Sequence, residues 1–442
     1  MKKLLLILFF LPAISWGACS GSSPIWTAAS ASRTDVNDCV TASSAGDTIN
    51  VPSGTQTWAT PITLSKGIQI VGAGVGNTII TKGGTSIFSI TTPSSANLLR
   101  ISGFTFKVAT GNEGGGIHMR CTDSASSPSY NIRVDNNLFT TPSGACTTGH
   151  CYIINYGCRG VIDNNTFEKA DYPLGVGLAG AFPGDVAWLE YPELVFGTAN
   201  DNIYIEDNVV TDASSAISDC DEGGRYVFRY NDITANNMWP MLDSHGGKRG
   251  VYSCMGVEIY GNYFVSNNTI MHANQASARA TAHHNYVTGD GVSQISDAEG
   301  CPVLQIEHLN NTYYFSNREA SLSGALIPVS SASATTCVAD PYPLTEDVVW
   351  WQDETACQAP STCSNQTSGV GCGTLANLPA SCTTGVGYWV TNQSCADLTN
   401  MVGVSPSTPI DGTLYKCTAT DTWTSWYTPY TYPHPLQEDF IR

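Results

Sequence analysis

The stretch RVDNNLF at residues 133–139 returns 28 residues later as VIDNNTF at residues 161–167. In both, alternating apolar and polar residues predict a short β-strand, and a pair of asparagines ends it. Similar β-rich runs continue along the chain, and their matching asparagines are Asn137, Asn165, Asn208, Asn231, Asn262, Asn285 and Asn310. The smallest spacing between these asparagines is 23 residues. A constant minimum with variable excess is typical of stacked coils that carry loop insertions.

A coil of this length accommodates three short strands and three turns, and its neighbour lies ~4.8 Å away. The asparagine at one turn can then hydrogen-bond the asparagines above and below it as a ladder. We therefore predict an all-β fold, a parallel β-helix. The alternative is an antiparallel sandwich, which does not require asparagine at a fixed place in each repeat.

The segment GDTINVPSGTQTWATPITLSKGIQIVGAG, residues 46–74, agrees with this prediction. It resembles the opening coil of the pectate-lyase-like, right-handed parallel β-helix superfamily, and the resemblance extends by pattern over about residues 46–325. The resemblance implies a right-handed solenoid that often acts on polysaccharide along one outer face. The same solenoid serves phage tailspikes and adhesins, so the resemblance alone does not imply an enzyme.

The first 17 residues have the pattern of a bacterial Sec-type signal peptide, with two lysines, an apolar run and then small residues. We therefore expect a secreted, extracellular protein. Lipid attachment at Cys19 is the alternative. The apolar run is too short to span a bilayer and no later stretch is apolar enough, so we expect no membrane insertion.

The cysteines support the same location. All 16 lie beyond the signal, and an exported chain with this usage is expected to form disulfides. Cys220 and Cys254 fall on adjacent predicted coils and could bridge them. We also hypothesise a bridge between Cys301 and Cys337, because an odd number of cysteines follows residue 336.

The formal net charge is −18, from 37 acidic and 19 basic residues. This charge argues against nucleic acid and against an anionic membrane surface as partners. A polyanionic polysaccharide would also be repelled unless cations bridge it or local arginines receive it.

Four segments follow from these patterns: a signal peptide at 1–17, an N-terminal capping segment at 18–58, the parallel β-helix at 59–335, and a C-terminal Cys/Trp/Tyr-rich segment at 336–442. The last segment either forms a disulfide-rich cap over the open coil edge or presents exposed aromatic residues to sugar. We favour the cap.

Polar side chains recur before the ladder asparagines, in the segments AISDCD, PMLDSH, TIMHAN and QISDAE. Aligning the segments predicts a first row of Asp219, Asp243, His272 and Asp297. A second row lies two residues on, on the same side of each strand, and comprises Asp221, His245, Asn274 and Glu299. A basic row six or seven residues beyond the first comprises Arg225, Arg249 and Arg279.

Two carboxylates on adjacent coils would lie ~4.8 Å apart and do not both ionise at low cost. Either a cation such as Ca²⁺ lies between them or one carboxyl keeps its proton. The predicted metal ligands are Asp219, Asp243 and Asp297.

The first functional hypothesis is a polysaccharide lyase that acts on a uronate-containing glycan. Resemblance to the lyases of the superfamily implies a cation on stacked aspartates, with Arg249 or Lys248 as base and His245 as proton relay. The catalytic candidates are His245, Arg249, Lys248, Arg225 and Asp221. The substrate-binding candidates are His272, Asn274, Arg279 and Glu299.

Two other functions stay open. An inverting glycoside hydrolase could use Asp219 and Asp221, ~6.6 Å apart along one strand, within the ~6.5–9.5 Å of that mechanism. SDCD followed by SHGG is also similar to polygalacturonases. The third hypothesis is a non-catalytic glycan-binding or self-assembling surface protein. The deciding feature is whether the loop at 174–197 and the aromatic tail leave the acidic rows open.

Overall fold

The computed structural model describes residues 18–438, except 92, 95, 109–114, 122–130, 142–149, 170–172, 178–195, 198–201, 214–215, 221–222, 236–240, 246–253, 267–269, 276–278, 289–291, 297–310, 333–343 and 361–362. The predicted signal peptide therefore lies outside the described residues. Within them the chain is nearly all β-structure. The helices are α1 (Arg33–Ala42), the short 3-10 helix η2 (Leu375–Asn377) and α3 (Pro435–Glu438).

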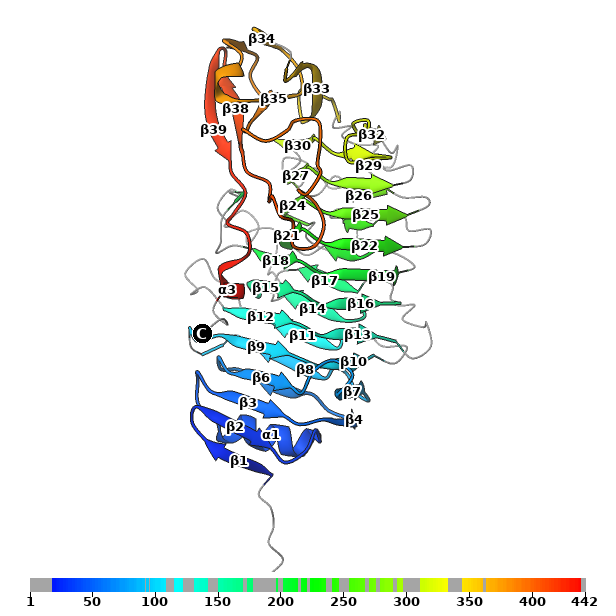
Figure 1. Ribbon diagram of the computed structural model, residues 1–442, viewed down its shortest axis with the longest axis vertical. Coiled ribbons are helices and arrows are strands. Elements are labelled where there is room, and N and C mark those ends of the chain that lie inside the picture. Colours follow the sequence, from blue (N-terminus) through cyan, green and yellow to red (C-terminus); the bar gives the residue numbers. More distant parts are fainter. Residues whose placement is uncertain are drawn as a thin grey trace, which may run out of the picture.

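Three long sheets form the body, and the chain visits them in rotation (Figure 1). In the body, sheet A contains β1 (Cys19–Ser22), β2 (Ile25–Ala28), β3 (Thr48–Val51), β6 (Gln69–Gly72), β9 (Leu99–Ser102), β12 (Ile132–Asp135), β15 (Gly160–Asp163), β18 (Ile203–Glu206), β21 (Arg225–Arg229), β24 (Gly256–Tyr260), β27 (Arg279–His283) and β30 (Thr312–Phe315). Sheet B contains β4 (Gly54–Trp58), β7 (Thr78–Lys82), β10 (Thr105–Lys107), β13 (Leu138–Thr140), β16 (Thr166–Glu168), β19 (Val209–Ala213), β22 (Asp232–Ala235), β25 (Tyr263–Ser266), β28 (Tyr286–Thr288) and β31 (Arg318–Glu319). Sheet C contains β5 (Ile62–Leu64), β8 (Phe88–Thr91), β11 (Ile117–Arg120), β14 (Ile153–Tyr156), β17 (Leu174–Gly177), β20 (Ser218–Cys220), β23 (Leu242–Ser244), β26 (Ile270–Asn274), β29 (Val292–Ser296) and β32 (Val329–Ala332).

From β3 onward each strand of the body pairs in parallel with the strand three places further along the chain. The strands of each passage through sheets A, B and C therefore pair with those of the previous passage, and we call one passage a coil. This all-β, parallel arrangement is compatible with the predicted β-helix. The antiparallel sandwich is wrong, because the antiparallel strand pairs in the described residues are β1–β2 and those of the C-terminal segment, beside one isolated bridge at Arg318–Leu326.

The core lies between the three sheets and is built from rows of like side chains. On sheet B, Phe106, Phe139 and Phe167 occupy matching positions of adjacent strands, and neighbouring rings lie about 5 Å apart. All three are buried. Burying each such side chain stabilises the fold by ~1.5–3 kcal/mol. Stacking of coils therefore follows from apolar residues that recur at one place in each repeat.

The asparagine ladder is present at the turn between sheets A and B. For each of Asn137, Asn165, Asn208, Asn231 and Asn262, the backbone N–H and Nδ2 donate to Oδ1 of the ladder asparagine in the next coil, over 2.9–3.1 Å. After Asn285 the ladder continues to Asn317. The prediction of Asn310 as the seventh member is therefore wrong. Asn310 itself lies outside the described residues.

The residue before each ladder asparagine has a left-handed backbone. Examples are Asn164 at φ 54°, Tyr230 at φ 54° and Gly261 at φ 69°. Asparagine and glycine tolerate this conformation better than most residues. In each asparagine pair of the sequence, the first asparagine therefore adopts the left-handed turn conformation and the second asparagine joins the ladder.

The N-terminal end of the body is covered by α1. Ser32 caps the helix by accepting a hydrogen bond from the Asp35 N–H at 3.1 Å. A disulfide joins Cys39 of the helix to Cys19 of β1. The Cys19 sulfur is thus bonded to Cys39, against the alternative of a lipid on that cysteine.

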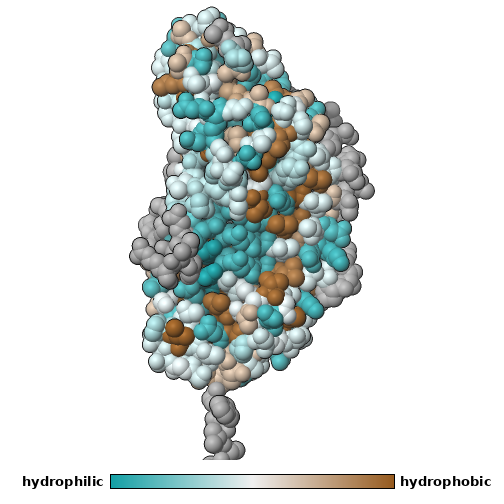
Figure 2. Space-filling model, viewed as in Figure 1, coloured by the Kyte–Doolittle hydropathy of each residue, from teal (hydrophilic) through white to brown (hydrophobic). Residues whose placement is uncertain are grey.

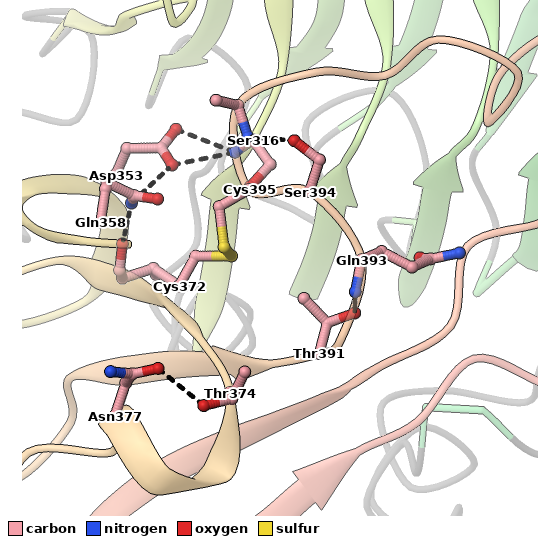
Figure 3. Close-up of a disulfide and its surroundings, with 12 residues drawn as sticks. Ser316, Asp353, Gln358, Cys372, Thr374, Asn377, Thr391, Gln393, Ser394 and Cys395 are labelled. Atoms are coloured by element: carbon pink, nitrogen blue, oxygen red, sulfur yellow. Dashed lines mark hydrogen bonds between the residues drawn. A yellow bond between two sulfur atoms is a disulfide. The ribbon is translucent and has the colours of Figure 1, made fainter. Parts of the chain in front are cut away.

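The C-terminal segment extends sheet A. β33 (Trp350–Gln358) pairs with β30, and β35 (Val370–Gly373) and β37 (Gly387–Val390) follow in parallel. β38 (Thr413–Ala419) and β39 (Thr422–Tyr427) close the sheet in antiparallel order, while β34 (Asn365–Gln366) pairs with β36 (Ser381–Cys382). Bridges join Cys357 to Cys363, Cys372 to Cys395, and Cys382 to Cys417. Near the second bridge, both oxygens of Asp353 accept the Ser316 N–H (Figure 3).

The aromatic residues of this segment form a second core. Trp351, Trp389 and Tyr427 are buried, and the rings of Trp351 and Tyr313 stack with centroids 5.0 Å apart. These side chains are therefore not exposed for sugar binding, because the end of sheet A supplies the surface that covers them.

The tail beyond β39 then runs back along the outer face of sheet A to α3, near β12 and β15 (Figure 1). We call residues 428–438 the strap. Arg229 donates to the backbone oxygens of Tyr430 and Thr431, and Arg133 donates to that of Leu436. Hydrophilic residues gather on the surface at this level of the body (Figure 2). Tyr430 and Tyr432 of the strap also pack against the rings of Tyr204 and Tyr230, so the strap covers charged and aromatic side chains together.

Six disulfides lie within the described residues, and no described cysteine is free. Such density indicates an oxidising compartment. The hypothesised Cys301–Cys337 bridge falls outside the described residues. Among the helices of the described part, none is long and apolar enough to cross a membrane.

Candidate functional site

Two aspartates lie side by side on sheet C. Asp219 of β20 pairs directly with Asp243 of β23, as the sequence predicts. Their chain neighbours Ser218, Cys220 and Leu242 are fully buried. Because successive side chains of a strand point to opposite faces, both carboxylates are on the outer face.

His245 joins the two carboxylates. Its Nε2 lies 2.8 Å from Oδ1 of Asp219 and 3.2 Å from Oδ2 of Asp243, and only 4% of its side chain is exposed. The predicted disulfide between Cys220 and Cys254 is confirmed, and it fixes the backbone of this histidine. The His245 N–H donates to the Cys220 oxygen at 2.8 Å, and the Cys254 N–H donates to the His245 oxygen at 3.0 Å.

A second histidine, which the sequence reasoning missed, completes the site. His150 precedes β14, and its Nε2–H donates to Oδ2 of Asp219 at 3.0 Å. Its ring lies over Gly175, the partner of Asp219 on β17. A β-carbon at Gly175 would be 2.5 Å from ring atoms of His150. The glycine one coil before Asp219 was the available signal, since it marks a place where something approaches the strand closely.

Gln275 is the other missed residue. Its Nε2 donates to Oδ1 of Asp243 at 2.8 Å. Each carboxylate therefore has one oxygen held by an outer side chain, His150 or Gln275, and the other oxygen turned toward His245.

The electrostatics keep Asp219 ionised. Burial raises the pKa of this carboxyl, but its contacts with His150 and His245 outweigh burial and hold the pKa well below its usual range. At neutral pH the site thus contains a buried carboxylate between two imidazoles. This arrangement suits acid–base chemistry, because a carboxylate orients a histidine and fixes its tautomer.

The predicted placement of His272 and Asn274 in the outer rows is wrong. His272 pairs with Leu242 and Asn274 with Ser244, so both side chains point into the core and are fully buried. Ala273 takes the place beside Asp243. His272 instead contacts Ser244 Oγ at 2.8 Å and Tyr314 OH at 2.9 Å. Burial lowers the pKa of His272 to about 3, so the imidazole is neutral.

The basic row is present in part. Arg225 and Arg279 begin β21 and β27 and occupy the same row of sheet A, but Gly256 lies between them. The prediction that Arg249 fills this place is wrong. Arg249 lies six residues after Asp243, whereas the next strand, β24, begins only at Gly256.

The remaining predicted site residues lie outside the described part of the chain: Asp221, Lys248, Arg249, Asp297 and Glu299. The loop at 174–197 is described only at β17 and at Phe196 and Gly197 beyond it. In the row of Asp243 and Ala273 the next position belongs to Gln294, so the predicted place of Asp297 in that row is wrong.

A metal ion could be held by Asp219, Asp243 and His245, whose ligand atoms lie within 4.8 Å of one another. Carboxylate oxygens suit the Ca²⁺ expected from the sequence, but an imidazole nitrogen does not, because Ca²⁺ takes six to eight oxygen ligands. The described donor set therefore fits Ca²⁺ poorly.

No protein-family model matches the chain, and a search of curated proteins found no match either. The fold class rests on the strand pairing, and the function must be argued from the site.

Proposed function

We propose that the chain is a right-handed parallel β-helix of the pectate-lyase-like type that cleaves a uronate-containing polysaccharide by elimination. The observation that carries the proposal is the carboxylate of Asp219, ionised and in contact with two imidazoles on the outer face of sheet C. A multi-coil face with such a group offers a long sugar chain several subsites in line.

Elimination needs a base for the proton beside the uronate carboxylate, and we assign this role to His150. With the Nε2–H donated to Asp219, Nδ1 is the proton-accepting atom of the neutral ring. The side chain is 22% exposed, whereas His245 is 4% exposed. A substrate can therefore reach His150 more easily than the histidine behind it.

The reaction balances with these groups. His150 takes the proton, the electrons of the broken C–H bond form a carbon–carbon double bond, and the bond to the leaving sugar oxygen breaks. The leaving oxygen takes a proton from water, and the hydroxide that remains takes the proton from His150. Asp219 and Asp243 would repel the uronate carboxylate in a site without water, because all three groups are negative. A positive charge near the two aspartates must therefore bind this carboxylate.

An inverting hydrolase is less well supported. Its two carboxyl groups stand ~6.5–9.5 Å apart to leave room for water. Asp219 and Asp243 are closer, because an oxygen of each lies within 3.2 Å of the same nitrogen of His245. The version with Asp221 involves a residue outside the described part.

The test is the ultraviolet absorbance of unsaturated uronate, measured on pectate, alginate and glycosaminoglycans. We expect product with one of these classes, and a fall of at least ~100-fold in His150→Ala and Asp219→Asn, the size expected of a lost general base. His118→Ala is the matched control. His118 lies in the same row of sheet C as Asp219, three strands before it. New reducing ends without absorbance would indicate a hydrolase, and neither signal would favour a binding or structural protein.

A further inference from the structure

We propose that Asp219, Asp243 and His245 bind one zinc-type ion, and not the Ca²⁺ expected from the sequence. The role of the ion, receiving the uronate carboxylate, rests on the proposed lyase function. Its binding does not, because the argument for binding uses only the geometry of the protein.

The first step is an unsatisfied oxygen. Oδ1 of Asp219 is buried and accepts no hydrogen bond within the described residues, although His245 Nε2 lies only 2.8 Å away. A buried carboxylate oxygen this close to an imidazole nitrogen, with no other partner in the described part of the chain, can serve as a metal ligand together with that nitrogen.

The distances between the ligand atoms can be compared with those of a zinc site. Ligands of a tetrahedral Zn²⁺, each ~2.0–2.1 Å from the ion, lie ~3.3 Å from one another. The contacts of His245 Nε2 with the two carboxylate oxygens are 2.8 and 3.2 Å. All three ligand atoms lie within 4.8 Å of one another, so adjustment of the side chains would bring them around one ion.

Neighbouring groups orient the three ligands. Ligating carboxylates are usually hydrogen-bonded through their other oxygen, which fixes their direction. His150 holds the other oxygen of Asp219, Gln275 holds that of Asp243, and the Cys220–Cys254 bridge fixes the backbone of His245. All three ligands are therefore oriented before any ion arrives.

The donor set decides the class of metal. Two carboxylates and one imidazole suit Zn²⁺ and other borderline first-row ions, while Ca²⁺ and Mg²⁺ prefer oxygen alone. Three protein ligands also leave a fourth position, as in catalytic zinc sites. That position is where a uronate carboxylate would be received.

The experiment measures ion binding without substrate. Chelator-treated full-length protein is titrated with Zn²⁺ and with Ca²⁺ by calorimetry, and Co²⁺ serves as a probe by its visible absorption. We expect one Zn²⁺ per chain, bound at least ~100-fold more tightly than Ca²⁺. Asp219→Asn, Asp243→Asn and His245→Ala should each abolish the Co²⁺ bands, and Gln275→Ala should weaken Zn²⁺ binding ~10–100-fold.

His118→Ala is the control and should bind Zn²⁺ as the unaltered chain does, and circular dichroism checks that each variant is folded. Absence of Zn²⁺ binding, tighter binding of Ca²⁺, or unchanged binding in the folded Asp219→Asn and Asp243→Asn variants would each overturn the proposal. Bound zinc without elimination products would instead refute the lyase and leave the zinc site standing. Elimination by a chain that binds no zinc would do the reverse.

Discussion

The ring of His150 lies against the α-carbon side of Gly175, so close that a β-carbon there would stand 2.5 Å from two ring atoms. No larger residue at this place would leave the ring room to reach the carboxylate on the next strand.

The first prediction follows from this contact. Gly175→Ala should displace the ring and lower lyase activity ~10–100-fold, because small misplacements of a catalytic group are costly. Product formation rates check this. In a His150→Ala background the same substitution should have no further effect on activity. An independent, additive loss in the double variant would contradict the assigned role of the glycine.

The second prediction concerns the bridge behind His245. Replacing Cys220 and Cys254 by serine should lower the free energy of unfolding by ~2–4 kcal/mol and also weaken Zn²⁺ binding. The matched control is the Cys121–Cys158 bridge, whose sequence separation of 37 is close to the 34 of the first. Its removal should lower stability similarly and leave Zn²⁺ affinity unchanged. Equal losses of affinity in both variants would show that only general loosening is involved.

The third prediction concerns the ladder. Asn262→Ala removes contacts with Asn231, Asn285 and the backbone oxygens of Phe228 and Tyr260. We expect a loss of ~2–4 kcal/mol in the free energy of unfolding, because buried partners are left unsatisfied. Denaturant titration measures it.

Asn50→Ala is the control for the ladder, since Asn50 is exposed on β3, and its effect should stay within ~0.5 kcal/mol. A similar small effect at Asn262 would mean that the ladder contributes register but little stability.

The fourth prediction is a pH dependence. Burial lowers the pKa of His272 to about 3, below the ordinary value of 6.5 in the unfolded chain. The unfolded chain therefore binds a proton first as pH falls, and the contribution of His272 to stability, present above about pH 6.5, is lost toward pH 3. Between these limits, His272→Gln should reduce the slope of unfolding free energy against pH by ~1.4 kcal/mol per pH unit.

Denaturant titrations at several pH values between 3.5 and 6.5 would measure this slope. The other buried histidines, such as His283 and His284, should keep part of the acid sensitivity in the variant. An unchanged slope would mean that His272 is already charged in the native protein.

Much of the fold could be predicted because the same residue types recur in each repeat. Ladder asparagines, the left-handed residues before them and the buried rows all recur at fixed places in each coil. Asp219 and Asp243 could be paired for the same reason.

The predicted register of the coil after Asp243 was shifted by one residue. Asp219 lies 12 residues before Asn231, and Ala273 lies 12 before Asn285, whereas the alignment placed His272 there at 13. A slip of one residue exchanges the inner and outer faces of a strand. His150 could not be found by aligning the repeats, because it precedes β14 and reaches Asp219 across Gly175 instead of from a matching row.

The strap is synthesised long after the strands that it contacts. Arg133 contacts Leu436 across 303 residues of chain, and Glu206 accepts the His434 N–H. Synthesis proceeds from the N-terminus, so the coils of β12 and β18 exist well before the residues that cover them. Until residues 428–438 pack against them, Glu206 and Arg229 face water, and their 2.5 Å contact is buried only when the strap is in place. A chain that lacks the strap would leave this ion pair in water, where such a pair contributes little to stability.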